Sequence, residues 1–172
     1  MEVRVQVHDP EWSRSFKREV ENLRDSWGDN LVAAHHVGST AIASILAKPI
    51  VDVLVEVRSI GLLDPLVSKM EARGYQAMGE YGLPGRRYFR KYDQAGDRTH
   101  HIHAFEVGNS QIHRLLVFRD CLLAHPAIAQ EYSSLKQRLA AAHPHDMRAY
   151  VEGKEPFIRD VEAKALVWGR TA

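Results

Sequence analysis

The residues best suited to chemistry in this chain are a glycine–hydroxyl turn and an acid in the apolar segment that follows. The turn is Gly38-Ser39-Thr40, and the acid is Asp52, within residues 50–57. Glycine lets a backbone come close to a ligand, and neighbouring amides and hydroxyls can hold a phosphate. A carboxylate in an apolar strand is costly unless a metal or hydrogen bond compensates it. The pattern predicts a phosphate or nucleotide site with a metal, and the alternative for the turn is a hydroxyl cap.

Glu56 shares one face of the same expected strand with Asp52, and Leu54 lies between them. At about 3.3 Å per residue, side chains at i and i+2 lie about 7 Å apart and those at i and i+4 about 13 Å apart. Two carboxylates at i and i+2 can converge on metal ions, whereas Asp52 and Glu56 cannot do so unaided. Leu54 stands where a second metal carboxylate is expected. A solvated strand end is the alternative for Glu56, and a structural hydrogen bond is the alternative for Asp52.

His100, His101 and His103 form the densest imidazole cluster of the sequence. In a strand, His101 and His103 face one side and His100 faces the other. Neighbouring histidines on one face suit a zinc or other transition-metal site, or contacts to phosphate. The alternative is a set of hydrogen-bonded histidines facing a polar cleft. If this strand lies beside that of Asp52, a histidine can join Asp52 around a single ion.

Three basic residues are further candidates for binding phosphate: Lys48, Arg90 and Lys154. Arg90 shares a face of an extended segment with Arg86 and Tyr88, and arginine with tyrosine can clamp phosphate and stack on a base. Lys48 comes just before the strand of Asp52, and Lys154 lies near the start of the last expected helix. A solvated strand face, and a lysine that points into water, are the alternatives.

These side chains must be positioned by a mixed sheet with flanking helices. Alternation and apolar runs predict strands at residues 3–7, 31–37, 50–57, 75–80, 87–92 and 99–107. Apolar spacing and end signals predict helices at residues 10–27, 62–73, 110–124, 126–142 and 146–168, with one helical turn at 44–47. The last three helices make a helical C-terminal third. We therefore expect one α+β domain over residues 1–172.

Composition narrows the class of protein. At 172 residues the chain can build one sizeable core, and a net charge of +1 gives no general attraction to nucleic acid or to anionic membranes. The single cysteine, Cys121, cannot form an internal disulfide, and the first residues alternate polar and apolar types, unlike a secretory signal. No run approaches the roughly 18 apolar residues of a membrane helix. A cytoplasmic protein that does not bind membranes is expected.

Several ordered blocks of the sequence resemble the GrpB family, over nearly the whole chain. The blocks are Asp9-Pro10-Glu11-Trp12, His36-Val37-Gly38-Ser39-Thr40 with Lys48-Pro49-Ile50-Val51-Asp52-Val53-Leu54-Val55, Thr99-His100-His101-Ile102-His103, Leu116-Val117-Phe118-Arg119-Asp120 with His125-Pro126, Tyr132-Ser133-Ser134-Leu135-Lys136-Gln137-Arg138-Leu139, and Tyr150 with Gly153-Lys154 and Phe157-Ile158. The resemblance implies a nucleotidyltransferase-like fold and nucleotidyltransferase activity. It also implies a link to coenzyme A biosynthesis, because the family occurs as a domain fused to dephospho-coenzyme A kinase.

The resemblance also implies roles for individual residues. In active nucleotidyltransferases a glycine–serine turn holds the triphosphate, and an Asp-x-Asp or Asp-x-Glu pair binds magnesium. Gly38 and Ser39 match the turn and Asp52 matches the first acid, whereas Leu54 departs from the second. Two-metal catalysis then requires a substitute ligand.

The expected function is therefore metal-dependent transfer of a nucleotidyl group from a nucleoside triphosphate to an unidentified acceptor. Phosphate binding is assigned to Gly38, Ser39, Thr40, Lys48, Arg90 and Lys154, and metal binding to Asp52, His101 and His103. The metal is expected to be Mg²⁺, or another divalent ion held through the histidines. Asp52 and His103 are assigned catalytic roles, as metal ligand and as ligand or general base. The alternative, which Leu54 favours, is a non-catalytic module that holds a nucleotide or coenzyme A-like ligand.

Overall fold

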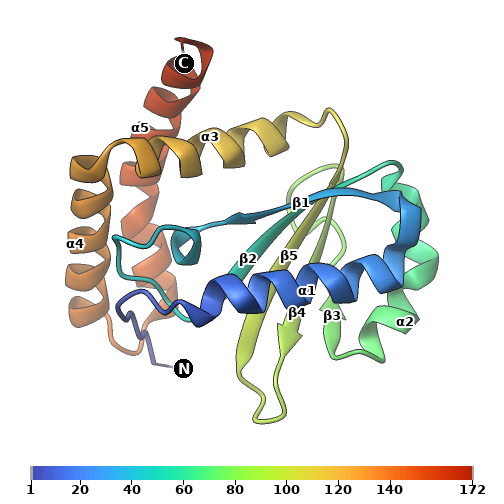
Figure 1. Cartoon of the computed structure of the whole chain (residues 1–172). Helices are drawn as coiled ribbons and strands as arrows, with labels where there is room; N and C mark the ends of the chain where they lie inside the picture. Colours follow the sequence, from blue (N-terminus) through green and yellow to red (C-terminus); the bar gives the residue numbers. More distant parts are fainter. Residues whose placement is uncertain (1, 172) are drawn as a thin grey trace. The chain divides into compact units, whose positions relative to one another are not determined.

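Figure 1 shows the computed structural model of the chain, which describes residues 2–171. The chain divides into two compact units. The sheet unit comprises residues 10–37 and 50–113, and the helical unit comprises the residues up to Asp9, Gly38–Pro49 and the residues from Arg114 onward. That residues 1–172 behave as one domain stays a prediction.

The sheet unit is built on a mixed sheet, as the sequence predicts, with five of the six expected strands. Its strands are β1 (Leu31–Val37), β2 (Val51–Val57), β3 (Tyr75–Ala77), β4 (Arg86–Tyr92) and β5 (Arg98–Glu106). The spatial order is β1-β2-β5-β4-β3. The central pair β2–β5 is parallel, and the other neighbouring pairs are antiparallel.

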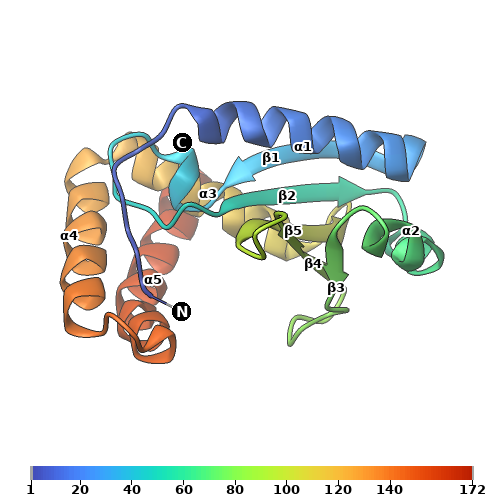
Figure 2. The ribbon, with the colours of Figure 1, turned by 90° about the horizontal axis from the view of Figure 1, so that it is seen from below.

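Helix α1 (Glu11–Trp27) covers one face of this sheet (Figures 1 and 2). Phe16 of α1 stacks on His36 of β1, with ring centroids 5.0 Å apart. Ser15 Oγ lies 2.9 Å from His100 Nε2 on β5. Because side chains alternate along a strand, His101 and His103 point to the opposite face from His100, as expected. His100 therefore lies on the face that α1 covers, and His101 and His103 lie on the opposite face.

A buried polar network joins α1 to the sheet. Glu19, of which only 2% is exposed, accepts hydrogen bonds from the hydroxyl of Tyr75 on β3 and from Lys91 on β4. The Lys91 Nζ–Glu19 Oε2 distance is 2.6 Å. Burial and the neighbouring carboxylate of Glu19 both raise the pKa of Tyr75, so its hydroxyl keeps its proton and can donate. Removing one partner of a charge buried this deeply would destabilise the fold, because the other charge would be left uncompensated.

The helical unit contains α4 (Pro126–Ala142), α5 (Met147–Thr171) and most of α3 (Ser110–Ala124). Helices α4 and α5 lie side by side (Figure 1). Their core cluster consists of Ile42, Ile45, Leu122, Ala129, Tyr132 and Val161. The bounds of α3 and α4 equal those that the apolar periodicity predicts, and α5 begins one residue later than predicted and ends three residues later.

Three local predictions are wrong. Residues 3–7 form no strand; Gln6 makes only an isolated bridge with Ala47, so alternation alone lacks a partner ladder here. No helical turn forms at residues 44–47, and a 3₁₀ turn, η2 (Ser39–Ala41), lies earlier instead. The α-helix expected at residues 62–73 forms only as a short α2 (Val67–Glu71), which follows a 3₁₀ segment, η3 (Ile60–Leu66), that contains Pro65, a residue without an amide donor.

Ser133 of α4 is one of the side chains that anchor the loop that replaces this helical turn. The amide of Leu46 donates to Ser133 Oγ at 2.9 Å, and Ser133 is buried. We expect Ser133→Ala to lower the free energy of unfolding by about 1–2 kcal/mol, because a buried amide loses its acceptor. Urea denaturation followed by circular dichroism measures this, and Ser134→Ala, at an exposed neighbouring position, is the matched control. Equal stability of the two variants would contradict the expectation.

Within residues 2–171, no helix is long and apolar enough to cross a membrane.

Candidate functional site

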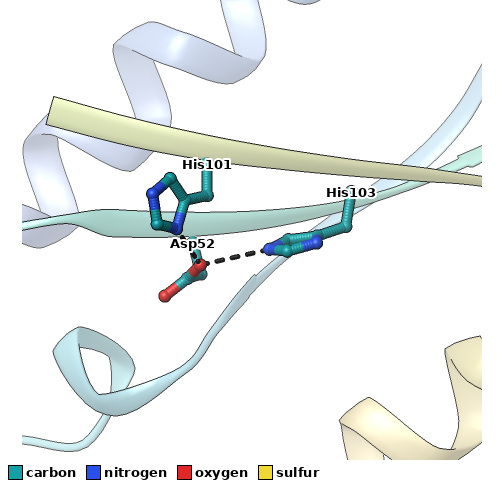
Figure 3. A group of neighbouring side chains, drawn as sticks. All are labelled: Asp52, His101 and His103. Atoms are coloured by element: carbon teal, nitrogen blue, oxygen red, sulfur yellow. Dashed lines mark hydrogen bonds and ion pairs between the residues drawn. The ribbon is translucent and has the colours of Figure 1, made fainter. Parts of the chain in front are cut away.

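The parallel pairing of β2 and β5 brings one acid and two histidines of the sheet unit together. Asp52 pairs with His101 in the strand register, and Leu54 pairs with His103. His101 Nδ1 lies 3.2 Å from Asp52 Oδ1, and His103 Nε2 lies 3.1 Å from the same oxygen (Figure 3). Figure 3 shows both imidazoles pointing from β5 toward the carboxylate. We refer to Asp52, His101 and His103 as the triad.

The triad has the spacing of a metal site. One ligand atom from each of its residues lies within 4.8 Å of the others. A tetrahedral zinc site with bonds of about 2.0 Å has ligand atoms about 3.3 Å apart, close to the two oxygen–nitrogen distances here. Two imidazole nitrogens and one carboxylate oxygen suit zinc, manganese or iron. Mg²⁺ prefers oxygen ligands and retained water, so the donor set fits a transition metal better than the expected Mg²⁺.

The electrostatics keep Asp52 in the form that binds metal. Removal from water raises the pKa of its carboxyl, but hydrogen bonds and positive charge from His101 and His103 outweigh this effect. The pKa of Asp52 therefore lies well below its usual range, although 26% of the side chain is exposed. Asp52 is thus an anion at neutral pH, as metal binding requires.

Tyr88 of β4 fixes the orientation of both imidazoles. Its ring stacks on that of His103 at 5.2 Å and 22°, and meets that of His101 edge-on at 5.6 Å. His101 Nε2 is buried and has no hydrogen-bond partner among the described residues. Metal ligation through Nδ1 would put the ring proton on Nε2, where the carboxylate or carbonyl acceptor found at most metal sites is missing. On its Nε2 side, the ring is held by aromatic packing against Tyr88.

Arg90 lies on the same face of the sheet as the triad. It pairs with His101 in the β4–β5 register. Its Nη2 donates to Tyr81 Oη at 2.9 Å, and its guanidinium lies 4.9 Å from the Tyr81 ring centroid and 5.5 Å from that of Tyr88. Tyr81 has a φ of 46°, which is uncommon for a residue with a side chain. The sequence pattern did not identify Tyr81 as part of this group, because it lies in a turn outside the alternating strand.

Glu56 does not join the triad. Its Oε1 lies 2.8 Å from His35 Nε2 on β1, and its side chain is only 19% exposed. It is therefore neither a substitute metal ligand nor the solvated strand end considered above. His35 was not identified from the sequence, since its partner depends on the antiparallel β1–β2 pairing. Leu54, where a second acid is expected, is fully buried.

In the helical unit, the glycine–hydroxyl turn has the backbone that its sequence suggests. Gly38 has φ 72° and ψ −175°, and the 3₁₀ turn η2 begins at Ser39. Ser39 Oγ accepts a hydrogen bond from Lys136 Nζ at 2.9 Å. Thr40 is buried. Lys136 was not singled out from the sequence, because its place among polar helix positions of α4 gives no signal.

Two of the three basic candidates from the sequence, Lys48 and Lys154, belong to the helical unit, and both lie against Tyr150. Lys48 Nζ is 5.5 Å and Lys154 Nζ is 4.5 Å from the Tyr150 ring centroid. Lys48 Nζ also lies 3.6 Å from Met147 Sδ. Both lysines are half-buried, so neither extends fully into water.

The backbone conformation of Gly38 predicts how a substitution there changes stability. Its φ and ψ lie in a region that is almost restricted to glycine, and a side chain there costs about 1–3 kcal/mol. We expect Gly38→Ala to lower the free energy of unfolding by that amount in urea denaturation. Gly61→Ala is the control, because Gly61 has a negative φ and an added Cβ meets no atom within 4 Å. A Gly38→Ala variant as stable as the control would show that the strain is absent.

Comparison with known proteins relates this chain to the family whose sequence blocks it resembles. The sequence model of the GrpB family, described as GrpB protein, matches residues 2–164. UPF0157 protein YqkA from Bacillus subtilis (strain 168) is 45% identical over 166 residues, covering 96% of this chain and 48% of YqkA. The chain thus spans about half the length of this relative. A dephospho-CoA kinase from Mycolicibacterium paratuberculosis is 29% identical over 189 residues, covering 96% of this chain and 46% of the kinase.

Solved structures agree with the sequence comparison. Conserved protein GrpB from Enterococcus faecalis matches with a TM-score of 0.90 at 41% identity, covering 95% of this chain and 97% of that chain. A Cid1 poly(U) polymerase structure with Mg 3′-dATP bound reaches a TM-score of 0.48 at 14% identity, covering 87% of this chain and 49% of that chain. The second likeness is too slight to support an inference about activity. The family expected from the sequence blocks is confirmed.

Proposed function

The chain belongs to the GrpB family, and we propose that it is a metal-dependent nucleotidyltransferase that acts on a nucleoside triphosphate and an unidentified acceptor. The observation that supports this proposal best is the triad, whose two imidazoles and carboxylate converge on one point. Arg90 on the same face of the sheet adds a cation for phosphate oxygens.

The four candidate site residues of the sheet unit each have a role in this proposal. Asp52, His101 and His103 hold a divalent ion, which supplies Lewis-acid stabilisation of charge on a phosphoryl oxygen. His103 Nε2 can ligate or accept a proton, but not both at once, and its stacking on Tyr88 directs it toward Asp52. We therefore assign His103 to ligation rather than to general-base work. Arg90 orients the phosphates, with its guanidinium held by Tyr81.

The helical unit supplies the phosphate-binding candidates that the sequence predicts: Gly38, Ser39, Thr40, Lys48 and Lys154. The left-handed backbone at Gly38 and the two lysines at Tyr150 support these assignments within that unit. Their roles are proposed on these contacts alone.

A second candidate function is a non-catalytic module that binds a nucleotide or a coenzyme A-like ligand. Two observations favour it: Leu54 is fully buried where a second acid is expected, and Glu56 is engaged by His35. The relatedness to proteins named dephospho-CoA kinase supports a coenzyme A-like ligand in this case.

One pair of measurements distinguishes the two functions. Thermal-shift titration with ATP, with and without Mn²⁺, Zn²⁺ or Mg²⁺, reports binding, and release of labelled pyrophosphate from γ-labelled nucleoside triphosphates reports transfer. Metal-dependent release that Asp52→Asn abolishes and Asp64→Asn retains is the result expected of the enzyme. ATP binding that needs no metal and is unchanged in Asp52→Asn would instead establish the binding module. Absence of any nucleotide binding would contradict both proposed functions.

A further inference from the structure

A tyrosine in the turn before β4 combines a strained backbone with an exposed ring. Tyr81 has a φ of 46°, and 55% of the residue is exposed. Three glycines of the same turn, Gly79, Gly82 and Gly85, also have positive φ. Glycine adopts this conformation without steric cost, whereas a tyrosine is strained by it. Strain of this kind clusters at ligand sites, so the ring at this position calls for a function.

A buried arginine holds the main chain of this turn. Arg86, of which only 8% is exposed, donates from Nη2 to the carbonyl oxygen of Tyr81 at 2.7 Å and from Nε to that of Glu80 at 3.1 Å. The carboxylate of Glu80 accepts a hydrogen bond from the amide of Gly85 at 2.8 Å. The conformation of Tyr81 is therefore imposed by its surroundings in the sheet unit, and the place of its ring is built into the fold.

The Tyr81 ring is the outer end of a row of rings that begins at the triad. Tyr88 stacks on His103 with centroids 5.2 Å apart, and Tyr81 lies next to Tyr88 at 5.4 Å. Tyr88 is buried, whereas more than half of Tyr81 is exposed. Arg90 lies 4.9 Å from the Tyr81 ring centroid and donates to its hydroxyl. These neighbours fix the ring and leave part of it open to a ligand beside the triad.

A fixed, exposed tyrosine ring suits a planar aromatic ligand. Nucleobases stack on tyrosine whatever their sequence, because every base has a π-face. A ring already held by Arg90 and Tyr88 loses little further freedom when a base stacks on it. The guanidinium of Arg90 is also available to the phosphates of the same ligand. The group thus pairs a contact for a flat ring with a contact for an anion.

We propose that Tyr81 is the stacking platform for the base of the bound nucleotide. The inference rests on the proposed nucleotide binding and adds the residue that recognises the base, to which neither candidate function assigns a side chain. Arg90 joins this platform to the phosphates, because it contacts the Tyr81 hydroxyl. The platform serves the nucleotidyltransferase and the binding module alike.

Isothermal titration of the full chain with ATP, at a fixed Mn²⁺ concentration, tests the platform. We expect Tyr81→Gly to lower the affinity for ATP by roughly 5- to 100-fold, and Tyr81→Phe, which keeps the ring, to stay within about twofold of the unmodified chain. Tyr81→Gly should keep its native circular dichroism, because glycine is unstrained at positive φ. Leu62→Ala is the matched control, since Leu62 is 57% exposed in the same unit and should not affect ATP binding.

Titration with tripolyphosphate separates stacking from the positioning of Arg90. Stacking requires a base, so Tyr81→Gly should bind tripolyphosphate as the unmodified chain does. Equal losses for ATP and tripolyphosphate would overturn the proposal, because Tyr81 would then act only through Arg90. Equal affinity for ATP in Tyr81→Gly and the unmodified chain would overturn it as well.

Failure of the platform is distinct from failure of the proposed functions. If Asp52→Asn leaves pyrophosphate release unchanged while Tyr81→Gly selectively loses ATP, the metal chemistry fails and the platform stands. If Tyr81→Gly binds ATP normally while Asp52→Asn abolishes release, the platform fails and the enzyme stands. Absence of ATP binding by the unmodified chain would overturn both.

Discussion

Asp52→Ala is expected to lower the affinity of the chain for Mn²⁺ or Zn²⁺ by more than about 100-fold. Loss of outer-shell partners alone costs about 10–100-fold in metal affinity, and Asp52 is a direct ligand in our account. It is also the anionic member of the triad, with a lowered pKa that keeps it charged. Isothermal titration of protein freed of metal with EDTA measures the change.

The control for this variant is Asp64→Ala in the same sheet unit. Asp64 is an exposed acid paired with Arg87, with Nε–Oδ1 at 2.6 Å. This variant should bind metal as the unmodified chain does, whereas His101→Ala and His103→Ala should each weaken binding strongly. Circular dichroism must show that Asp52→Ala is folded. Metal affinity that is equal in Asp52→Ala and Asp64→Ala would mean that the triad is only a hydrogen-bonded structural cluster.

Lys91→Met is expected to lower the free energy of unfolding by about 3–5 kcal/mol, because removing one partner of a buried ion pair leaves an uncompensated charge. Here the remaining charge is Glu19, which is 2% exposed and would keep only the hydroxyl of Tyr75. Urea denaturation followed by circular dichroism gives the difference directly.

Two further variants separate the buried charge from the loss of a long side chain. Lys17→Met, at an exposed position of α1, should change stability by no more than about 0.5 kcal/mol. The double variant Glu19→Met with Lys91→Met should recover much of the lost stability, because apolar replacement of a buried pair is often neutral. If Lys91→Met is as stable as Lys17→Met, the network contributes little and α1 is held by its apolar contacts.

Local elements of this protein were predictable because periodicity and end signals are local. The predicted bounds of β1, α3 and α4 are those of the structure, and β2 differs by one residue. Residues 3–7 show the limit of this reasoning. Their alternation is as regular as that of a strand, but a strand also needs a paired neighbouring strand, and among the described residues this segment makes only an isolated bridge, between Gln6 and Ala47.

The triad was predictable in part. Alternation placed His101 and His103 on one face, and the spacing argument ruled out Glu56 as a partner of Asp52. That β5 lies parallel to β2, which brings these residues together, is a long-range pairing that no local pattern determines. The same applies to His35, which engages Glu56 only because β1 pairs with β2.

Lys136 shows a different kind of limit. A lysine among polar helix positions predicts a solvated side chain, and nothing in its neighbours along the chain suggests burial. Its environment is set by Ser39 and Leu46, which are about ninety or more positions earlier in the sequence. Buried cations of this kind become visible only when the packing of the helical unit is known.

The central claim is that Asp52, His101 and His103 bind one divalent ion. Anomalous X-ray diffraction from crystals grown with Mn²⁺ or Zn²⁺ tests it most directly. Our account predicts one anomalous peak about 2.0–2.3 Å from Asp52 Oδ1, His101 Nδ1 and His103 Nε2. Absence of a peak at the triad under saturating metal, with both imidazoles still hydrogen-bonded to Asp52, would contradict it.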